Sequence, residues 1–224
     1  MLMALALTAE YACRNYFGPA ASGRNDRLGA IFMRGRNLNG FYVLAIVLAL
    51  SLSTIAQETL YNNGPDGDVG YYHVNFGAVV TDSFTLSEAA SITSTILTFY
   101  DVDDRNRPLH LKWSITTEPL GGTVLGTGSA DIVVLEPPYI TQFLFFGWKT
   151  SFTIPNLNLP AGTYYLQIQD VVTQWDTYVF WAETSGGASQ GFYEAVGQSG
   201  AGTVSPVPSE SFEVMGQWQP ERAN

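Results

Sequence analysis

The chain after residue 57 alternates apolar and polar residues in short runs, and this pattern predicts β-strands. The run at 79–86 places Phe84 and Leu86 on one face and Ser83 and Thr85 on the other, which is the period of a half-buried strand. Comparable runs, rich in β-branched and aromatic residues, lie at 71–76, 92–100, 109–117, 148–154, 162–172, 177–183 and 212–217. A helical period is nearly absent from this part of the sequence, so the fold is expected to be all-β.

The spacing of these runs predicts how the strands pack. Two more runs, at 123–127 and 130–135, are interrupted by Gly126 and Gly128 and predict one bent or bulged strand. About nine or ten strands with turn residues between them are typical of an antiparallel β-sandwich, here jelly-roll-like, with an eight-stranded closed barrel as the alternative. The segment 185–210, rich in Gly, Ser, Ala and Pro, predicts a long irregular connection before the final strand.

The segment 157–168 gives the most detailed expectation about the core. Leu157 and Leu159 can anchor the end of one strand, and the Pro-Ala-Gly sequence at 160–162 turns the chain. In the strand that follows, Tyr164, Leu166 and Ile168 fall on alternate positions. These three side chains are therefore expected to face inward.

Residues 41–56, FYVLAIVLALSLSTIA, form an uncharged and mainly apolar run that predicts a secretory signal. Arg34 and Arg36 precede it, and Thr54 and Ala56 are the small residues expected before a cleavage site. Residues 33–56 are therefore expected to be a signal peptide, 1–32 a spurious N-terminal extension, and 57–224 a single secreted β-sandwich domain. The alternative is an uncleaved anchor, although a membrane-spanning helix needs roughly 20 apolar residues.

Cleavage after Ala56 would change the composition of the part that folds. The single cysteine, Cys13, precedes the cut, so disulfides, cysteine-based zinc sites and a thiol nucleophile are excluded from the mature region. The mature region holds five basic and eighteen acidic residues, a net charge of −13 compared with −10 for the whole chain. Such a surface repels phosphate backbones and anionic lipids, so we expect no nucleic-acid partner and no membrane association after cleavage.

Short stretches spread over the mature region carry a resemblance to known exported proteins. They are LYNNGP at 60–65, VTDSFTL at 80–86, LKWSI at 111–115, PLGGT at 119–123, GTG at 126–128, LPAGTYYLQI at 159–168 and SFEVMG at 211–216. Together they resemble a group of secreted bacterial proteins, many of which carry PEP-CTERM sorting tails. The resemblance implies an extracellular β-sandwich with no assigned reaction. The chain departs from that pattern after Gly216, where no Pro-Glu-Pro motif or basic tail follows, so release into the medium or the envelope, or attachment through a partner, is expected.

The loop YDVDDRNRP at 100–108 is a candidate calcium site. Asp101, Asp103, Asp104 and Asn106 supply oxygen atoms directly after a predicted strand, and calcium takes about six to eight oxygen ligands. The spacing is not that of an EF-hand, and Arg105 can neutralise these carboxylates, so a solvated acidic turn is the alternative. The NNGPDGD segment at 62–68 is a second, weaker candidate, for which turn chemistry is an adequate explanation.

Aromatic residues near the ends of predicted strands are candidates for ligand binding. Trp148, Trp175 and Trp181 lie where loops gather, and flat rings at such positions can stack on sugars. The alternative is that these large side chains fill the core, which is also what the alternation around Trp113 predicts. A separate apolar cluster predicts an interface, an edge that pairs with another subunit, or additional core; it consists of Tyr139, Phe143, Phe145 and Phe146.

The sequence offers little support for catalysis. His73 and His110 are each isolated in strand-like surroundings, and no nucleophile elbow, metalloprotease, P-loop or dinucleotide-binding motif occurs. We therefore expect a secreted, non-enzymatic structural or interaction protein of the bacterial envelope or extracellular matrix. Its expected partners are an envelope protein, an extracellular glycan or a second copy of itself. A carbohydrate-binding module is the alternative, and a glycan-active hydrolase is less favoured.

Overall fold

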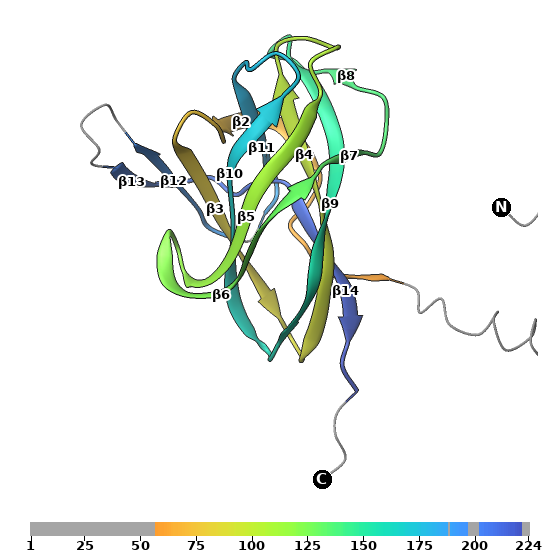
Figure 1. Ribbon diagram of the computed structural model, residues 1–224, viewed down its shortest axis with the longest axis vertical. Helices are drawn as coiled ribbons and strands as arrows, with labels where there is room; N and C mark the ends of the chain where they lie inside the picture. The colour runs from red at the N-terminus through yellow and green to blue at the C-terminus, as the bar shows by residue number, and fades with distance from the viewer. Residues whose placement is uncertain (1–56, 188, 197–201, 221–224) are drawn as a thin grey trace, which may run out of the picture. The chain divides into compact units, whose positions relative to one another are not determined.

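The structure is a computed structural model that describes residues 57–187, 189–196 and 202–220. These residues form fourteen strands in two antiparallel sheets, one of eight strands and one of six (Figure 1). Within these ranges no helix is long and apolar enough to cross a membrane. The predicted extension and signal peptide at 1–56 lie outside the described residues.

The eight-stranded sheet is organised around the long strand β4. Its hydrogen-bonded path runs β1-β14-β4-β11-β2, and β9 also pairs with β4 and carries the two short strands β7 and β8. The strands of this sheet are β1 Glu58–Asn62, β2 Asp66–His73, β4 Ala90–Asp101, β7 Val133–Val134, β8 Tyr139–Ile140, β9 Phe146–Leu159, β11 Val179–Thr184 and β14 Phe212–Trp218.

The six-stranded sheet has the order β13-β12-β3-β10-β5-β6. Its strands are β3 Ala78–Leu86, β5 Pro108–Glu118, β6 Gly121–Asp131, β10 Gly162–Thr173, β12 Gly191–Val196 and β13 Gly202–Val207. The two sheets remain separate, so the closed single sheet considered as an alternative is not formed by the described residues. The β-sandwich-like, all-β prediction is confirmed at this level.

Strand β4 changes its neighbour along one edge. Leu97 pairs with Phe212 of β14, whereas Phe99 pairs with Trp181 of β11. Thr98 lies between these two pairs and is matched with a residue of β9 on the other edge. The ends of β14 and β11 therefore meet opposite Thr98, and this junction positions the candidate site described below.

Both sheets contribute side chains to one buried apolar cluster, as the alternation in the sequence predicted. Tyr164, Leu166 and Ile168 of β10 are all buried, and so are Phe84 and Leu86 of β3. The inward positions predicted for these residues are confirmed.

The predicted bent strand at 123–135 is two strands that belong to different sheets. Strand β6 continues through Gly126 and Gly128 in the six-stranded sheet, with a register shift between Val124 and Gly126 that agrees with the predicted bulge, and β7 joins the other sheet after Ile132. The glycines serve packing and do not end the strand: a Cβ on Gly128 would lie 3.2 Å from the buried ring of Trp113. Glycine therefore lets the chain lie flat against that ring.

The segment 185–210 is not wholly irregular, which corrects the sequence-based expectation. Strand β12 pairs with β3 and carries β13 along its other edge. In β12, Tyr193 packs against the buried apolar cluster, whereas β13 is an edge strand with little apolar alternation. Together with β1 and the two-residue strands β7 and β8, they account for the difference between fourteen strands and the predicted nine or ten.

Candidate functional site

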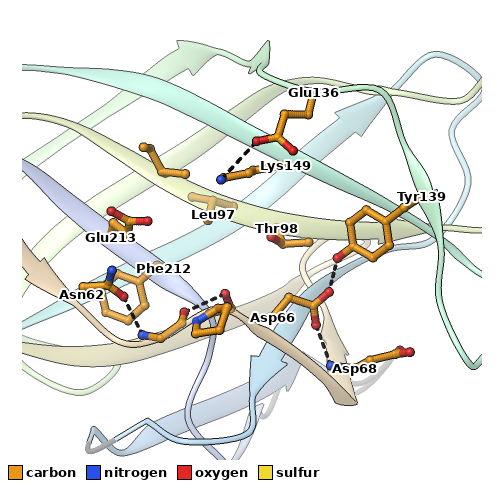
Figure 2. A pocket seen from close by; sticks show the side chains of 14 residues that line it. Asn62, Asp66, Asp68, Leu97, Thr98, Glu136, Tyr139, Lys149, Phe212 and Glu213 are labelled. Carbon is orange, nitrogen blue, oxygen red and sulfur yellow. Dashed lines mark hydrogen bonds and ion pairs between the residues drawn. The ribbon is translucent and has the colours of Figure 1, made fainter.

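A pocket of about 400 Å³ opens on the eight-stranded sheet beside the junction of β14 and β11 (Figure 2). Pockets for small ligands typically have volumes of roughly 300–1,000 Å³. The lining comes from several parts of the chain that are distant in sequence: the β1–β2 connection, β4, the segment around β8, β9 and β14. Its polar side chains include Asn62, Asp66, Thr98, Lys149 and Glu213.

Strand register places these polar side chains on the outer face of the sheet. Leu97 belongs to the buried core, so its neighbours Ile96 and Thr98 point to the opposite face. Ile96 is paired with Glu213 of β14, and Thr98 with Lys149 of β9. Paired residues share a face, so a carboxylate and an ammonium group lie in neighbouring rows of one pocket wall.

The Asp66 carboxylate is the centre of the hydrogen bonding at one end of the pocket. It accepts hydrogen bonds from the hydroxyl groups of Tyr100 and Tyr139 and, at 2.8 Å, from the backbone N–H of Asp68. Burial, reinforced by the neighbouring Asp66 carboxylate, raises the pKa of both tyrosines. Both hydroxyls therefore stay protonated at physiological pH and keep donating to Asp66.

A glycine allows the Tyr139 ring to reach Asp66. Tyr139 of β8 is paired with Gly147 of β9, and a Cβ on Gly147 would lie 2.3 Å from the Tyr139 ring. The ring therefore lies directly over the backbone of β9, with its hydroxyl turned toward Asp66 (Figure 2). In this position the ring is still partly exposed and forms an aromatic wall of the pocket.

Two further contacts fix the polar groups around this wall. The Asp68 carboxylate accepts a hydrogen bond of 2.6 Å from the backbone N–H of Gln142, and the Gln142 side chain donates to the Asp68 carbonyl oxygen. On the other side, Lys149 Nζ lies 3.2 Å from Glu136 Oε1. The pocket is thus built from side chains that are held before any ligand arrives.

A chain of aromatic rings continues from the pocket along the outer face of the sheet. We call it the aromatic track; it consists of Tyr71, Phe76, Phe143, Phe145, Tyr178 and Phe180. Tyr71 is its centre, with ring centroids 5.2 Å from Phe143, 5.0 Å from Phe145 and 4.8 Å from Phe180. Two members of the apolar cluster predicted from the sequence, Phe143 and Phe145, therefore lie in a surface assembly.

Three carboxyl side chains are buried at a separate place, outside the lining of the pocket. Glu210 and Asp82 are fully buried and Glu183 nearly so. Burial raises the pKa of Asp82 to about 6. Burial, with the added repulsion of Asp82 and Glu183, raises the pKa of Glu210 well above its usual range, and burial also raises the pKa of Glu183.

The compensating contacts in this buried carboxyl cluster are concentrated on Asp82, which also accepts a hydrogen bond of 2.6 Å from the backbone N–H of Ser83. Asp82 accepts hydrogen bonds from the backbone N–H of Glu210 at 2.5 Å and from the side chains of Asn63 and Ser209 at 3.3 and 3.2 Å. Neither carboxyl oxygen of Glu210 has a hydrogen-bond partner within the described part of the chain. No ion pair between described residues reaches Asp82, Glu183 or Glu210.

The three tryptophans predicted to bind a ligand do not share an exposed face, which corrects that interpretation. Trp148 and Trp181 are buried, because both are paired with Phe99, a core residue, and therefore point inward with it. Trp175 alone is exposed, at 45%, and its ring lies 5.1 Å from the guanidinium group of Arg105. The aromatic surface lies elsewhere, on the aromatic track.

The acidic loop predicted to bind calcium is divided between the interior and the surface. Asp101 and Asn106 are buried, and Asn106 Nδ2 donates to Asp101 Oδ2 at 2.9 Å. Asp103 and Asp104 point outward, where Arg105 pairs with both. Across the described ranges, no group of three or more His, Cys, Asp or Glu side chains is placed to hold a metal ion. These contacts favour a closed acidic turn, and calcium binding stays a prediction.

The NNGPDGD segment at 62–68, the weaker of the two calcium candidates, supplies residues both to the pocket and to the buried carboxyl cluster. Asp66 and Asp68 lie in the pocket, while Asn63 turns inward to the buried carboxyl cluster. Sequence reasoning missed Glu136, Lys149 and Glu213, because each is a single charged residue in an ordinary strand or loop pattern. Only the pairing of β4 with β9 and β14 brings Lys149 and Glu213 together.

Comparisons with known proteins give no indication of what the pocket binds, so its interpretation rests on its geometry. No protein-family profile matches the chain, and no curated protein matches it either.

Proposed function

We propose that the chain is a secreted, non-enzymatic interaction protein of the bacterial envelope or extracellular matrix, with a jelly-roll-like sandwich fold, and that its partner is an extracellular glycan. The observation that carries the proposal is the pocket on the eight-stranded sheet, where the Tyr139 ring lies among fixed polar side chains. The proposal includes the relationship to exported proteins of the PEP-CTERM type that the sequence resemblance suggests.

The chemistry of the lining matches the chemistry of a sugar. A pyranose ring has an apolar face of C–H groups, which packs on an aromatic ring, and a rim of hydroxyl groups that both donate and accept hydrogen bonds. Tyr139 offers the ring, Glu213 offers acceptors, Lys149 offers donors and Asn62 offers both. The net charge of −13 for residues 57–224 disfavours anionic polymers, so the proposed glycan is uncharged.

The same contacts support binding rather than catalysis. Three of the pocket's carboxylates are engaged, Asp66 by two phenol groups, Asp68 by a backbone N–H and Glu136 by Lys149, which leaves Glu213 without the second free carboxylate that a glycoside hydrolase pairs with it. Carboxyl groups held in this way position their neighbours, whereas a general acid or base must be free to exchange a proton with the substrate. A hydrolase would be detected as release of reducing ends from polysaccharides incubated with the protein.

The Tyr139→Ala variant is expected to bind uncharged glycans about tenfold more weakly than the wild type, since one aromatic contact of about 1.4 kcal/mol is lost. The measurement is binding of the full-length chain to a glycan array, followed by titration with the strongest ligand. Trp175→Ala is the matched control, because Trp175 is exposed but does not line the pocket. An array without any bound glycan, or equal affinities for wild type and Tyr139→Ala, would contradict the proposal.

Self-association is the second candidate function, favoured by one observation. Ile140 and Leu144 are 68% and 78% exposed, on the segment that Gln142 fixes against Asp68. Large apolar side chains held in an exposed position are typical of a contact with another protein surface. A concentration-dependent dimer in sedimentation, combined with an empty glycan array, would favour this function over glycan binding.

A further inference from the structure

The aromatic track begins where the pocket ends. Asp66 accepts hydrogen bonds from Tyr139, which lines the pocket, and from Tyr100. The Tyr100 ring lies 6.1 Å from Tyr71, the central ring of the aromatic track. Tyr100 itself is fully buried, so a ligand seated against Tyr139 would reach the track along the segment 139–145, which also carries the track residues Phe143 and Phe145.

The rings of the aromatic track form a series that leads away from the pocket. Successive ring centroids lie 4.8 Å apart from Tyr71 to Phe180, 6.3 Å from Phe180 to Tyr178 and 4.9 Å from Tyr178 to Phe76. The last two rings are the most open: Tyr178 is 55% and Phe76 is 52% exposed. Phe180 is stacked between Phe145 and Tyr178, so the aromatic surface that the track offers to a ligand lies mainly at its two ends, on Phe143 and on Tyr178 and Phe76.

The composition of the track distinguishes among extended ligands. Its six members include no charged side chain, and Tyr71 and Tyr178 add phenol hydroxyls to the ring faces. Aromatic faces with hydroxyl groups at their edges suit a polymer that is apolar on its faces and hydroxylated along its rim. The acidic surface of the chain disfavours polyanions such as nucleic acids.

We infer that the site takes an extended, uncharged polysaccharide chain, with one sugar in the pocket and the following sugars lying along the aromatic track as far as the exposed rings of Phe76 and Tyr178. The inference rests on the proposed function and adds the length and the direction of the ligand. The pocket sets the position of the first sugar, and the track adds affinity with each further sugar.

The test compares short and long ligands on the full-length chain. Isothermal titration uses dimers and hexamers of β-1,4-linked glucose and of β-1,4-linked N-acetylglucosamine. The variants are Tyr139→Ala in the pocket, the double variant Phe76→Ala/Tyr178→Ala at the far end of the track, and Tyr178→Phe, which keeps the ring. Val204→Ala on β13 of the other sheet is the control. Thermal melting of each variant confirms that it is folded.

The wild type should bind one of the hexamers about tenfold or more tightly than the matching dimer, because further rings are engaged. The double variant should lose about that factor for the hexamer and none for the dimer. Tyr139→Ala should weaken both ligands, and Tyr178→Phe should resemble the wild type. Equal affinities for dimer and hexamer, or a double variant with unchanged hexamer binding, would overturn the extended-chain inference while leaving pocket binding intact. No binding of any of the four sugars would overturn this inference, and the proposed function itself fails only if the glycan array is also empty.

Discussion

Replacing Glu210 by Gln is expected to stabilise the protein at pH 7.5 by about 2 to 3 kcal/mol, and to change its stability little at pH 5. The reason is that the folded state must either bury an uncompensated carboxylate or keep a proton that the unfolded chain releases at pH 7.5, and both cost free energy. Glu210 is fully buried, and neither of its carboxyl oxygens has a partner among the residues that the structure describes. Gln occupies nearly the same volume without the charge.

The pH dependence follows from the direction of the pKa shifts in the buried carboxyl cluster. Burial raises the pKa of Asp82 to about 6 and raises the pKa of Glu210 well above its usual range. For each of these carboxyl groups the pKa is lower in the unfolded chain than in the folded protein. At pH values between its unfolded and folded pKa, the folded state therefore binds more protons than the unfolded state does. Stability from Asp82 is therefore fully present below its unfolded pKa and is lost as the pH rises through about 6.

The groups that face Glu210 reinforce this behaviour. They are Asp82 of β3, Glu183 of β11 and Tyr72 of β2, and each repels a charge on Glu210 or is repelled by it. Urea unfolding of wild type and Glu210→Gln at the two pH values measures the effect, with the exposed Glu118→Gln as the matched control. A Glu210→Gln variant that is less stable than the wild type at both pH values would show that the buried charge is favourable, contrary to the expectation.

Replacing Trp181 by Ala is expected to destabilise the fold by about 3 to 5 kcal/mol, whereas Trp175→Ala should change stability by less than about 0.5 kcal/mol. Trp181 is fully buried, its Nε1 donates to the Ser211 carbonyl oxygen at 3.0 Å, and its ring packs 5.6 Å from Phe212. Its removal leaves a large cavity at the junction of β11 and β14. Trp175 is exposed, and its ring makes a cation–π contact with Arg105.

Equilibrium unfolding in urea distinguishes the two tryptophans directly. Trp181→Phe is a useful intermediate, because it keeps most of the apolar volume and removes the hydrogen bond to Ser211. Equal and small effects of Trp175→Ala and Trp181→Ala would contradict the buried position of Trp181 and would restore the interpretation of both as surface residues.

The sequence predicted the strands whose two faces differ. In β10, Tyr164, Leu166 and Ile168 alternate with polar residues, and the same period places them in the core. Strands β12 and β13 were not predicted, because both are short, Gly-, Ser- and Pro-rich stretches flank them, and their place depends on the pairing of β12 with β3 and of β13 with β12. Alternation reveals the side-chain burial of long strands, and it says little about short strands that lie between Gly-rich and Pro-rich segments.

The candidate site could be predicted only in part, for a related reason. Asp66 and Asp68 attracted attention as turn residues rich in oxygen, but nothing in the local sequence connects them with Tyr139 or Lys149. Those contacts depend on the register of β8, β9 and β4 and on the room that Gly147 leaves for a ring. For two of the three tryptophans, the sequence-based prediction was wrong. Their residue type suggested a surface role, but Trp148 and Trp181 lie on the inward-facing positions of their strands and are buried.

The central claim is that the outer-face pocket of the eight-stranded sheet binds a glycan, and ligand-induced shifts of backbone amide signals in NMR test it most directly. The full-length chain, labelled with ¹⁵N, is titrated with hexamers of β-1,4-linked glucose and N-acetylglucosamine. With at least one hexamer, we predict shift changes concentrated at Asp66, Thr98, Tyr139, Lys149 and Glu213, which surround the pocket. Saturable changes confined to the six-stranded sheet would contradict the claim, and so would spectra that neither hexamer alters if the glycan array is also empty.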